Sequence, residues 1–257
     1  MSGLVTYSVL LVSIVVLGGL IIEKAGKGVL KHLNLMLAFG GAFLMALVFL
    51  HLIPELFSTA EQSGLTLKQI GWFALGGFLL QVFLEYFSKG VEHGHHHEGH
   101  GKQSFPLMVF LSLCIHAFIE AMPLAGGVHD HGHHHHDHLH VHLAGDSLLI
   151  GILIHKLPVA LVLAGILASS GLPKWKSWMY LGFFGVIPVV GMLLGDALIH
   201  WEGINANILI TALTAILVGI LFHISTTILF ETSEEHRFNL QKLITVIVGF
   251  LIAGLTL

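Results

Sequence analysis

Three side chains inside long apolar runs have the types and spacing of a transition-metal site. His116 and Glu120 stand four residues apart, which places an imidazole and a carboxylate on one face of a helix, one turn apart. His155 lies near the middle of the next apolar run, so antiparallel neighbouring helices would bring it to a similar depth. Two imidazoles and one carboxylate leave a position open for water, as labile zinc binding requires. We therefore predict that His116, Glu120 and His155 ligate a divalent metal ion.

The depth of these residues strengthens this interpretation, because ionisable groups in mid-membrane are costly and usually functional. Pro158, three residues after His155, would free a backbone carbonyl one turn earlier, and that carbonyl could serve as an additional ligand. The alternative is that the polar side chains only form interhelical hydrogen bonds that hold the helices together.

Other ionisable residues in or near the apolar runs are weaker candidates. His51 and Glu55 are four apart near the outer end of the second run and could receive the incoming ion, although solvation of a helix end explains them equally well. His223 and Glu231 are candidate pathway residues in the seventh run and at its cytoplasmic end. Capping or snorkelling accounts for Glu85.

The elements that must position these residues are transmembrane helices. Of 257 residues, 55% are hydrophobic and only 10% are charged, far below the roughly 25% charge of soluble domains. A crossing needs about 20 largely apolar residues. We expect an all-α polytopic membrane protein with eight transmembrane helices in one domain over residues 1–257. The apolar runs fall at about 4–22, 33–57, 66–88, 105–126, 146–169, 177–199, 206–230 and 238–257.

Basic residues predict the orientation, because cytoplasmic loops are enriched in lysine and arginine. In the eight-helix arrangement one side of the membrane holds almost all of them, and only Lys68 falls on the other. This bias places both termini outside the cytoplasm, and we expect a multi-pass protein of the cell membrane. The first run lacks a basic leader and a cleavage site, so we expect it to be retained. The residues on the cytoplasmic side are Lys24, Lys27, Lys31, Lys89, Lys102, Lys174, Lys176, Arg237 and Lys242.

Histidine is unusually frequent, at 21 residues against 11 lysines plus arginines, and imidazole is the commonest protein ligand for transition metals. Many histidines fall in two low-complexity loops, at 91–104 on the predicted cytoplasmic side and at 128–144 on the other. We expect the outward loop to raise the local metal concentration and the cytoplasmic loop to accept the delivered ion. The histidines predicted to capture metal are His95, His96, His97, His133, His134, His135 and His136.

Several partners are not expected from this composition. The net charge of −4 and the scattered basic residues indicate no nucleic-acid surface. The single cysteine, Cys114, excludes an intrachain disulfide framework. We expect no resident cofactor and no enzymatic activity. The partners are divalent metal ions and the lipid bilayer, and the oligomeric state is open, with a homodimer among the alternatives.

The motifs resemble the ZIP (Zrt/Irt-like) family of metal transporters. The resemblance rests on the eight apolar runs, the His-rich loop after the third run, the segment His51-Leu52-Ile53-Pro54-Glu55, and the paired motifs around His116 and His155. It implies a central metal site between the fourth and fifth helices, outward-facing termini, and uptake of zinc or related ions toward the cytoplasm.

The chain departs from the family pattern at three positions. Ala117 stands where the fourth-helix motif has asparagine, Val159 where the fifth-helix motif has glutamate, and Ile187 where a glutamate often precedes a proline in the sixth helix. The carboxylates for a second metal are therefore missing. Lys156 resembles a branch of the family with lysine beside this histidine. Its ammonium would repel a second cation and partly balance Glu120, so we predict one transported ion per site.

The sequence thus predicts transmembrane transport of divalent transition-metal ions, most simply zinc uptake by alternating access. Imidazole and carboxylate also accept Fe²⁺, Mn²⁺, Co²⁺, Ni²⁺, Cu²⁺ and Cd²⁺. A His-rich exporter, a sensor or degenerate relic, and a channel-like pathway are the alternatives. An intramembrane zinc hydrolase is a further one, since three protein ligands plus water is also a catalytic zinc geometry. His-Glu-x-x-His is absent from the sequence.

Overall fold

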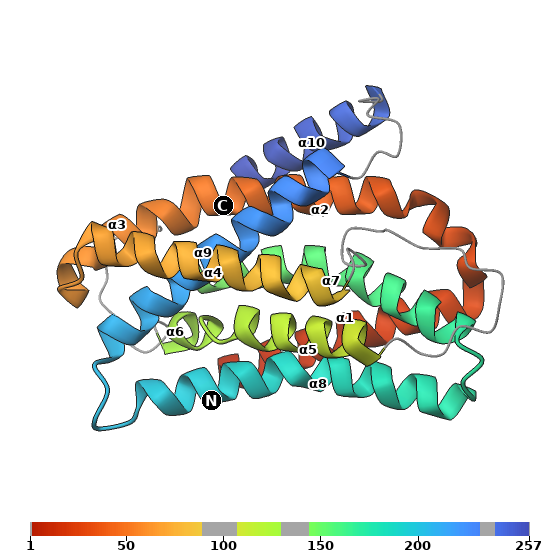
Figure 1. The fold of residues 1–257 in the computed structure, drawn as a ribbon, viewed down its shortest axis with the longest axis horizontal. Helices are drawn as coiled ribbons and strands as arrows, with labels where there is room; N and C mark the ends of the chain where they lie inside the picture. The colour runs from red at the N-terminus through yellow and green to blue at the C-terminus, as the bar shows by residue number, and fades with distance from the viewer. Residues whose placement is uncertain (1, 89–106, 130–143, 232–239, 257) are drawn as a thin grey trace.

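The computed structural model describes residues 2–88, 107–129, 144–231 and 240–256, and none of these residues forms a strand. The long helices run side by side in one bundle (Figure 1). In chain order the elements are α1 (Ser2–Ala25), the 3₁₀ turn η1 (Gly26–His32), α2 (Leu33–Leu47), the π-helical turn η2 (Val48–Leu52), α3 (Ile53–Ser63), α4 (Leu67–Ser88), α5 (Leu107–Ala121), α6 (Leu124–His129), α7 (Ala144–Ser169), α8 (Lys174–Ile199), α9 (Ala206–Glu231) and α10 (Leu240–Thr256).

The predicted all-α membrane fold is confirmed. Seven helical spans within the described ranges are long and apolar enough to cross a membrane, and α10 is a shorter apolar helix of 17 residues. Each of the eight predicted runs coincides with one of these elements. The assignment of residues 1–257 to a single domain stays a prediction.

Two predicted helices are interrupted at prolines. The second run continues from α2 through η2 into α3 and ends at Ser63 rather than near residue 57. Pro54 has no N–H, so the chain takes a π-helical turn in which the Ile53 N–H bonds to the Val48 carbonyl. The fourth run breaks at Met122 and Pro123 and resumes as α6. This break directly follows the turn that carries Glu120.

Local capping signals explain where several helices begin and end. Thr66 and Gln69 form a reciprocal capping box at the start of α4, in which the Thr66 N–H donates to Gln69 Oε1 at 2.9 Å and the Gln69 N–H to Thr66 Oγ1 at 3.3 Å. Asn205 Oδ1 accepts N–H groups in the first turn of α9. Gly64 ends α3 with φ +70°, a conformation that favours glycine.

The helices pack in two groups. Helices α2, α3, α4, α9 and α10 pack chiefly on one another, and α1, α5, α6, α7 and α8 form the second group. Figure 1 shows the first group in the upper part of the bundle and most of the second below it. The two groups meet mainly where α2 packs on α7 and α4 on α5. Helix α7 is the most buried span and α4 the least.

Glycines set the closest helix contacts. A Cβ atom at Gly77 of α4 would collide with the Ile216 carbonyl oxygen of α9, and one at Gly219 of α9 would collide with the Ala74 carbonyl oxygen of α4. Gly191 of α8 likewise faces a carbonyl of α5, that of Phe118. Small residues let helix backbones approach closely in a membrane, where apolar burial alone does not drive association.

Candidate metal-transport site

The predicted fourth-helix pair is buried in the interior of the bundle. His116 is 4% exposed and Glu120 is 2% exposed, and both lie on α5. The His116 Nε2 and Glu120 Oε2 atoms are 3.5 Å apart, one helical turn along the same face. An imidazole nitrogen and a carboxylate oxygen therefore point to the same place, as the four-residue spacing predicted.

His155 of α7 lies beside this pair. It is buried, and its ring centroid is 6.1 Å from that of His116, with the two rings nearly perpendicular. Gly40 of α2 packs close to this part of α7, since a Cβ atom there would lie 3.7 Å from His155 Cα. Helices α5 and α7 contact each other here through side chains. The close backbone neighbours of α5 are α4 and α8. The structure brings His116, Glu120 and His155 into one region.

The three side chains do not already form a closed ligand shell. Within the part of the chain that the structure describes, no group of three or more His, Cys, Asp or Glu side chains is gathered tightly enough to hold a metal ion. Zinc–ligand bonds are about 2.0–2.2 Å long. The side chains would have to close around an ion that binds here.

Lys156 follows His155 and is equally buried. Its Nζ lies 4.5 Å from the centre of the Phe184 ring of α8. The ammonium also lies within Coulombic range of the Glu120 carboxylate. A buried ammonium needs such partners, because an isolated charge in an apolar interior is costly. A positive charge therefore sits close to the carboxylate of the predicted site.

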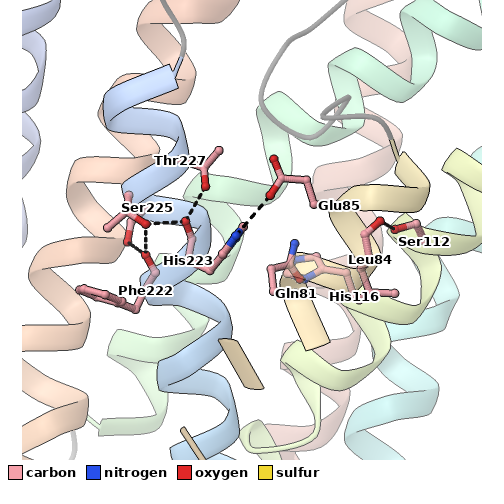
Figure 2. Close-up of polar contacts among 10 residues, drawn as sticks. Gln81, Leu84, Glu85, Ser112, His116, Phe222, His223, Ser225 and Thr227 are labelled. Carbon is pink, nitrogen blue, oxygen red and sulfur yellow. Dashed lines mark hydrogen bonds and ion pairs between the residues drawn. The ribbon is translucent and has the colours of Figure 1, made fainter. Parts of the chain in front are cut away.

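Helix α4 contributes two polar side chains that were not among the predicted site residues; Gln81 was missed, and Glu85 was given another role. Gln81 is fully buried, and its Oε1 is 3.1 Å from His116 Nδ1. Glu85, one turn further along α4, lies with its Oε2 3.4 Å from Nε2 of His223 on α9. Figure 2 shows the Glu85–His223 contact and the neighbouring side chains of Gln81 and His116. The assignment of Glu85 to capping or snorkelling was wrong, because its carboxylate pairs inside the bundle.

His51 and Glu55 lie on other elements, and the side chains of the remaining candidates lie outside the described residues. His51 sits in the π-helical turn η2, and its Nε2 is buried without a hydrogen-bond partner among the described residues. Glu55 follows in the first turn of α3. Glu231 ends α9, and its side chain lies outside the described residues. So do the predicted metal-capturing histidines, His95, His96, His97, His133, His134, His135 and His136.

Comparison with known proteins decides the family. The ZIP zinc transporter family model matches residues 106–256, more than half of the chain. The chain belongs to the ZIP zinc transporter family. A search of curated proteins finds no match. Family membership and the apolar helices make this chain a multi-pass integral membrane protein that transports divalent metal ions.

The family match contains α5 and α7 but not α1 to α4. Gln81 and Glu85 therefore belong to the part of this ZIP protein that the match leaves out, although they touch His116 and His223 within it. Gln81 and Glu85 stand four residues apart inside an apolar run, as His116 and Glu120 do. This spacing was the sequence signal that could have identified them as candidate site residues.

The positions where this chain departs from the ZIP pattern are used for packing. Ala117 and Val159 are buried in one apolar cluster, and Ile187 packs against that cluster. Their side chains supply no oxygen or nitrogen ligand. The positions that lack the carboxylates for a second metal therefore carry apolar side chains, and these pack α5, α7 and α8 together.

Proposed function

We propose that this ZIP protein carries zinc toward the cytoplasm through one buried site formed by His116, Glu120 and His155. The observation that carries the proposal is the burial of two imidazoles and one carboxylate side by side in apolar helices. Such groups are costly in a membrane interior and are usually retained for function. Two nitrogens and one oxygen suit zinc and leave room for water.

One ion occupies the site at a time in this proposal. Lys156 adds a positive charge near Glu120, and an ammonium there disfavours a second cation. Ala117 and Val159 provide no ligand atoms, so a second ion would find no carboxylate of its own. The charge of Glu120 is then shared between Lys156 and the ion, which weakens binding of the ion and favours its release.

The proposed orientation in the membrane rests on the lysines, and the uptake direction on the resemblance to ZIP proteins. Helices α1 and α9 end, and α8 and α10 begin, at the same end of the bundle (Figure 1). Glu23 of α1 and Lys174 of α8 pair there at 3.1 Å, and Lys68 lies in the first turn of α4 at the opposite end. We assign the lysine-rich end to the cytoplasm by the positive-inside rule, in the cell membrane, with both termini outside.

The route of the ion follows from the same assignment. His51 lies toward the outer end of the bundle and offers a buried imidazole nitrogen to an arriving ion. The Glu85 and His223 pair lies toward the cytoplasmic end of α4 and α9 and would receive an ion that leaves the central site. The two helix groups supply surfaces that can move against each other, as alternating access requires.

Zinc uptake into proteoliposomes that contain a zinc-sensitive dye tests this proposal. The full-length protein is reconstituted in known orientation and compared with His116→Ala, Glu120→Ala and His155→Ala. The matched control is His200→Ala, because His200 lies at the exposed end of α8. We expect influx from the outward face that all three central substitutions abolish and His200→Ala preserves.

Two other results would contradict the proposal. Zinc efflux without influx would identify an exporter. Uptake that survives the three central substitutions would place the site elsewhere. Repeating the assay with Fe²⁺, Mn²⁺, Co²⁺, Ni²⁺, Cu²⁺ and Cd²⁺ then ranks the transported ions, since the ligand types accept several of them.

A further inference from the structure

Gln81 is a buried polar residue whose position in the fold calls for an explanation. It lies in the last third of α4, is fully buried, and is followed and preceded by apolar residues. Its side-chain amide reaches across to α5, where Oε1 lies 3.1 Å from His116 Nδ1 (Figure 2). A buried amide is retained at a cost unless its hydrogen bonds have a purpose in packing or function.

The chemistry of this contact places a proton on Nδ1 of His116 and so excludes the neutral tautomer protonated only at Nε2. An amide oxygen only accepts hydrogen bonds, so the His116 nitrogen that faces it must carry the proton. A neutral imidazole protonated at Nδ1 has its lone pair at Nε2. Nε2 is the nitrogen that lies 3.5 Å from Glu120 Oε2. When Nε2 carries no proton, as metal binding requires, its lone pair and the carboxylate face the same side, where the ion would bind between them.

We propose that Gln81 is a positioning residue that holds His116 in its zinc-binding tautomer. This inference rests on the proposed function, in which His116 is a ligand. Hydrogen bonds to the second nitrogen of a metal-binding histidine fix the ring orientation and raise its basicity, and their loss typically costs about 10–100-fold in metal affinity. Gln81 acts through His116 and does not itself contact the ion.

The contact also links the two helix groups. Gln81 belongs to the group that contains α4 and α9, and His116 to the group that contains α5 and α7. A relative movement of the groups that separates α4 from α5 breaks the Gln81–His116 hydrogen bond. The site then binds zinc more weakly in the arrangement where this bond is absent, which couples affinity to the direction of access.

A second hydrogen bond between the same helices provides the control for a purely structural role. Ser112 Oγ donates to the Leu84 carbonyl at 2.7 Å, one turn of α5 away from His116, and does not involve the metal ligands. If interhelical bonding alone matters, Ser112→Ala and a Gln81 substitution should behave alike, since such bonds average about 0.6 kcal/mol in membrane proteins.

The experiment compares Gln81→Met, Gln81→Glu, Ser112→Ala and His116→Ala in the full-length protein. Methionine keeps the volume but accepts no strong hydrogen bond, and a glutamate carboxylate accepts one as the amide oxygen does. Zinc uptake gives KM and Vmax in proteoliposomes. The visible absorption of bound Co²⁺ gives site occupancy, taken as the difference from His116→Ala so that binding to the His-rich loops cancels.

We expect Gln81→Met to raise KM by about 10–100-fold with Vmax retained and to weaken the Co²⁺ difference spectrum. Gln81→Glu should keep KM at or below the wild-type value, and Ser112→Ala should leave it unchanged. A Gln81→Met protein that matches Ser112→Ala overturns the inference, as does a Gln81→Glu protein that loses affinity to the same extent, because the amide would then donate. Unchanged transport by His116→Ala would instead refute the proposed function itself.

Discussion

Replacing Gly77 by alanine should push α4 away from α9 and disturb the polar contacts that α4 makes. A Cβ atom at Gly77 would collide with the Ile216 carbonyl oxygen and lie 2.8 Å from its carbon, so the helices must separate by more than the roughly 0.6 Å that the carbon alone needs to reach ordinary contact at 3.4 Å. Gly77, Gln81 and Glu85 stand at intervals of four on one face of α4, so a shift at the first displaces the other two.

The magnitude follows from these distances. Glu85 Oε2 and His223 Nε2 are 3.4 Å apart, so a displacement of more than roughly 0.6 Å lengthens their separation beyond about 4 Å, the outer limit of an ion pair. Overpacking costs about 1–3 kcal/mol, and replacing a helical glycine by alanine returns about 0.5–1 kcal/mol. A net loss of about 1–2 kcal/mol corresponds to a fall in Tm of about 2–8 °C for a chain of this size.

The adjacent glycine is a matched control. A Cβ atom at Gly76 meets nothing within 4 Å, so Gly76→Ala keeps the packing and should raise the stability of α4 slightly. Tm is measured by tryptophan fluorescence in nanodiscs, and KM by zinc uptake. We expect Gly77→Ala alone to lower Tm and to raise KM by about 10-fold, the lower limit for loss of residues that support a metal site. Equal Tm and KM values for the two variants would refute the reasoning.

Two further predictions concern charge near the pathway. Lys156→Met removes the ammonium near Glu120 and should lower the KM for zinc by about tenfold or more while slowing release. Unit charges even about 10 Å apart interact by about 1.7 kcal/mol at an effective dielectric constant of about 20, and about 1.4 kcal/mol is tenfold. The exposed Lys174→Met is its control, and an unchanged KM for Lys156→Met would contradict the expectation. Glu85→Gln and His223→Gln, combined in a double-mutant cycle on thermal stability, should show a coupling energy of about 0.5–3 kcal/mol, whereas strict additivity would mean that the pair contributes nothing.

Much of the fold could be predicted because its signals are local. A membrane helix satisfies its own backbone hydrogen bonds, so hydropathy and length alone indicate where the chain crosses. The i and i+4 spacing of His116 and Glu120 places both on one helical face in any tertiary context, and the structure confirms it. The interruptions at Pro54 and Pro123 were also readable in principle, because proline lacks the N–H that an unbroken helix uses.

The partners of these residues could not be predicted in the same way. Glu85 looked like a solvated helix-end residue because its neighbours in sequence say nothing about α9, which begins more than 100 residues later. Its pairing with His223 depends on how closely α4 and α9 approach, and Gly77 and Gly219 set that approach. Glycine is frequent in this chain, with 30 residues, so the sequence did not indicate which glycines matter.

The sequence by itself therefore determined the membrane-spanning helices, the burial of His116, Glu120 and His155 within them, and the ZIP family resemblance. Those features depend on hydrophobicity and on helical periodicity, which act within a single segment. Only the tertiary structure decided that Gln81 contacts His116, that Glu85 contacts His223, and that α5 faces α7 through side chains rather than through close backbone packing. Those contacts depend on which helix surfaces fit together, and that fit is a property of the whole bundle.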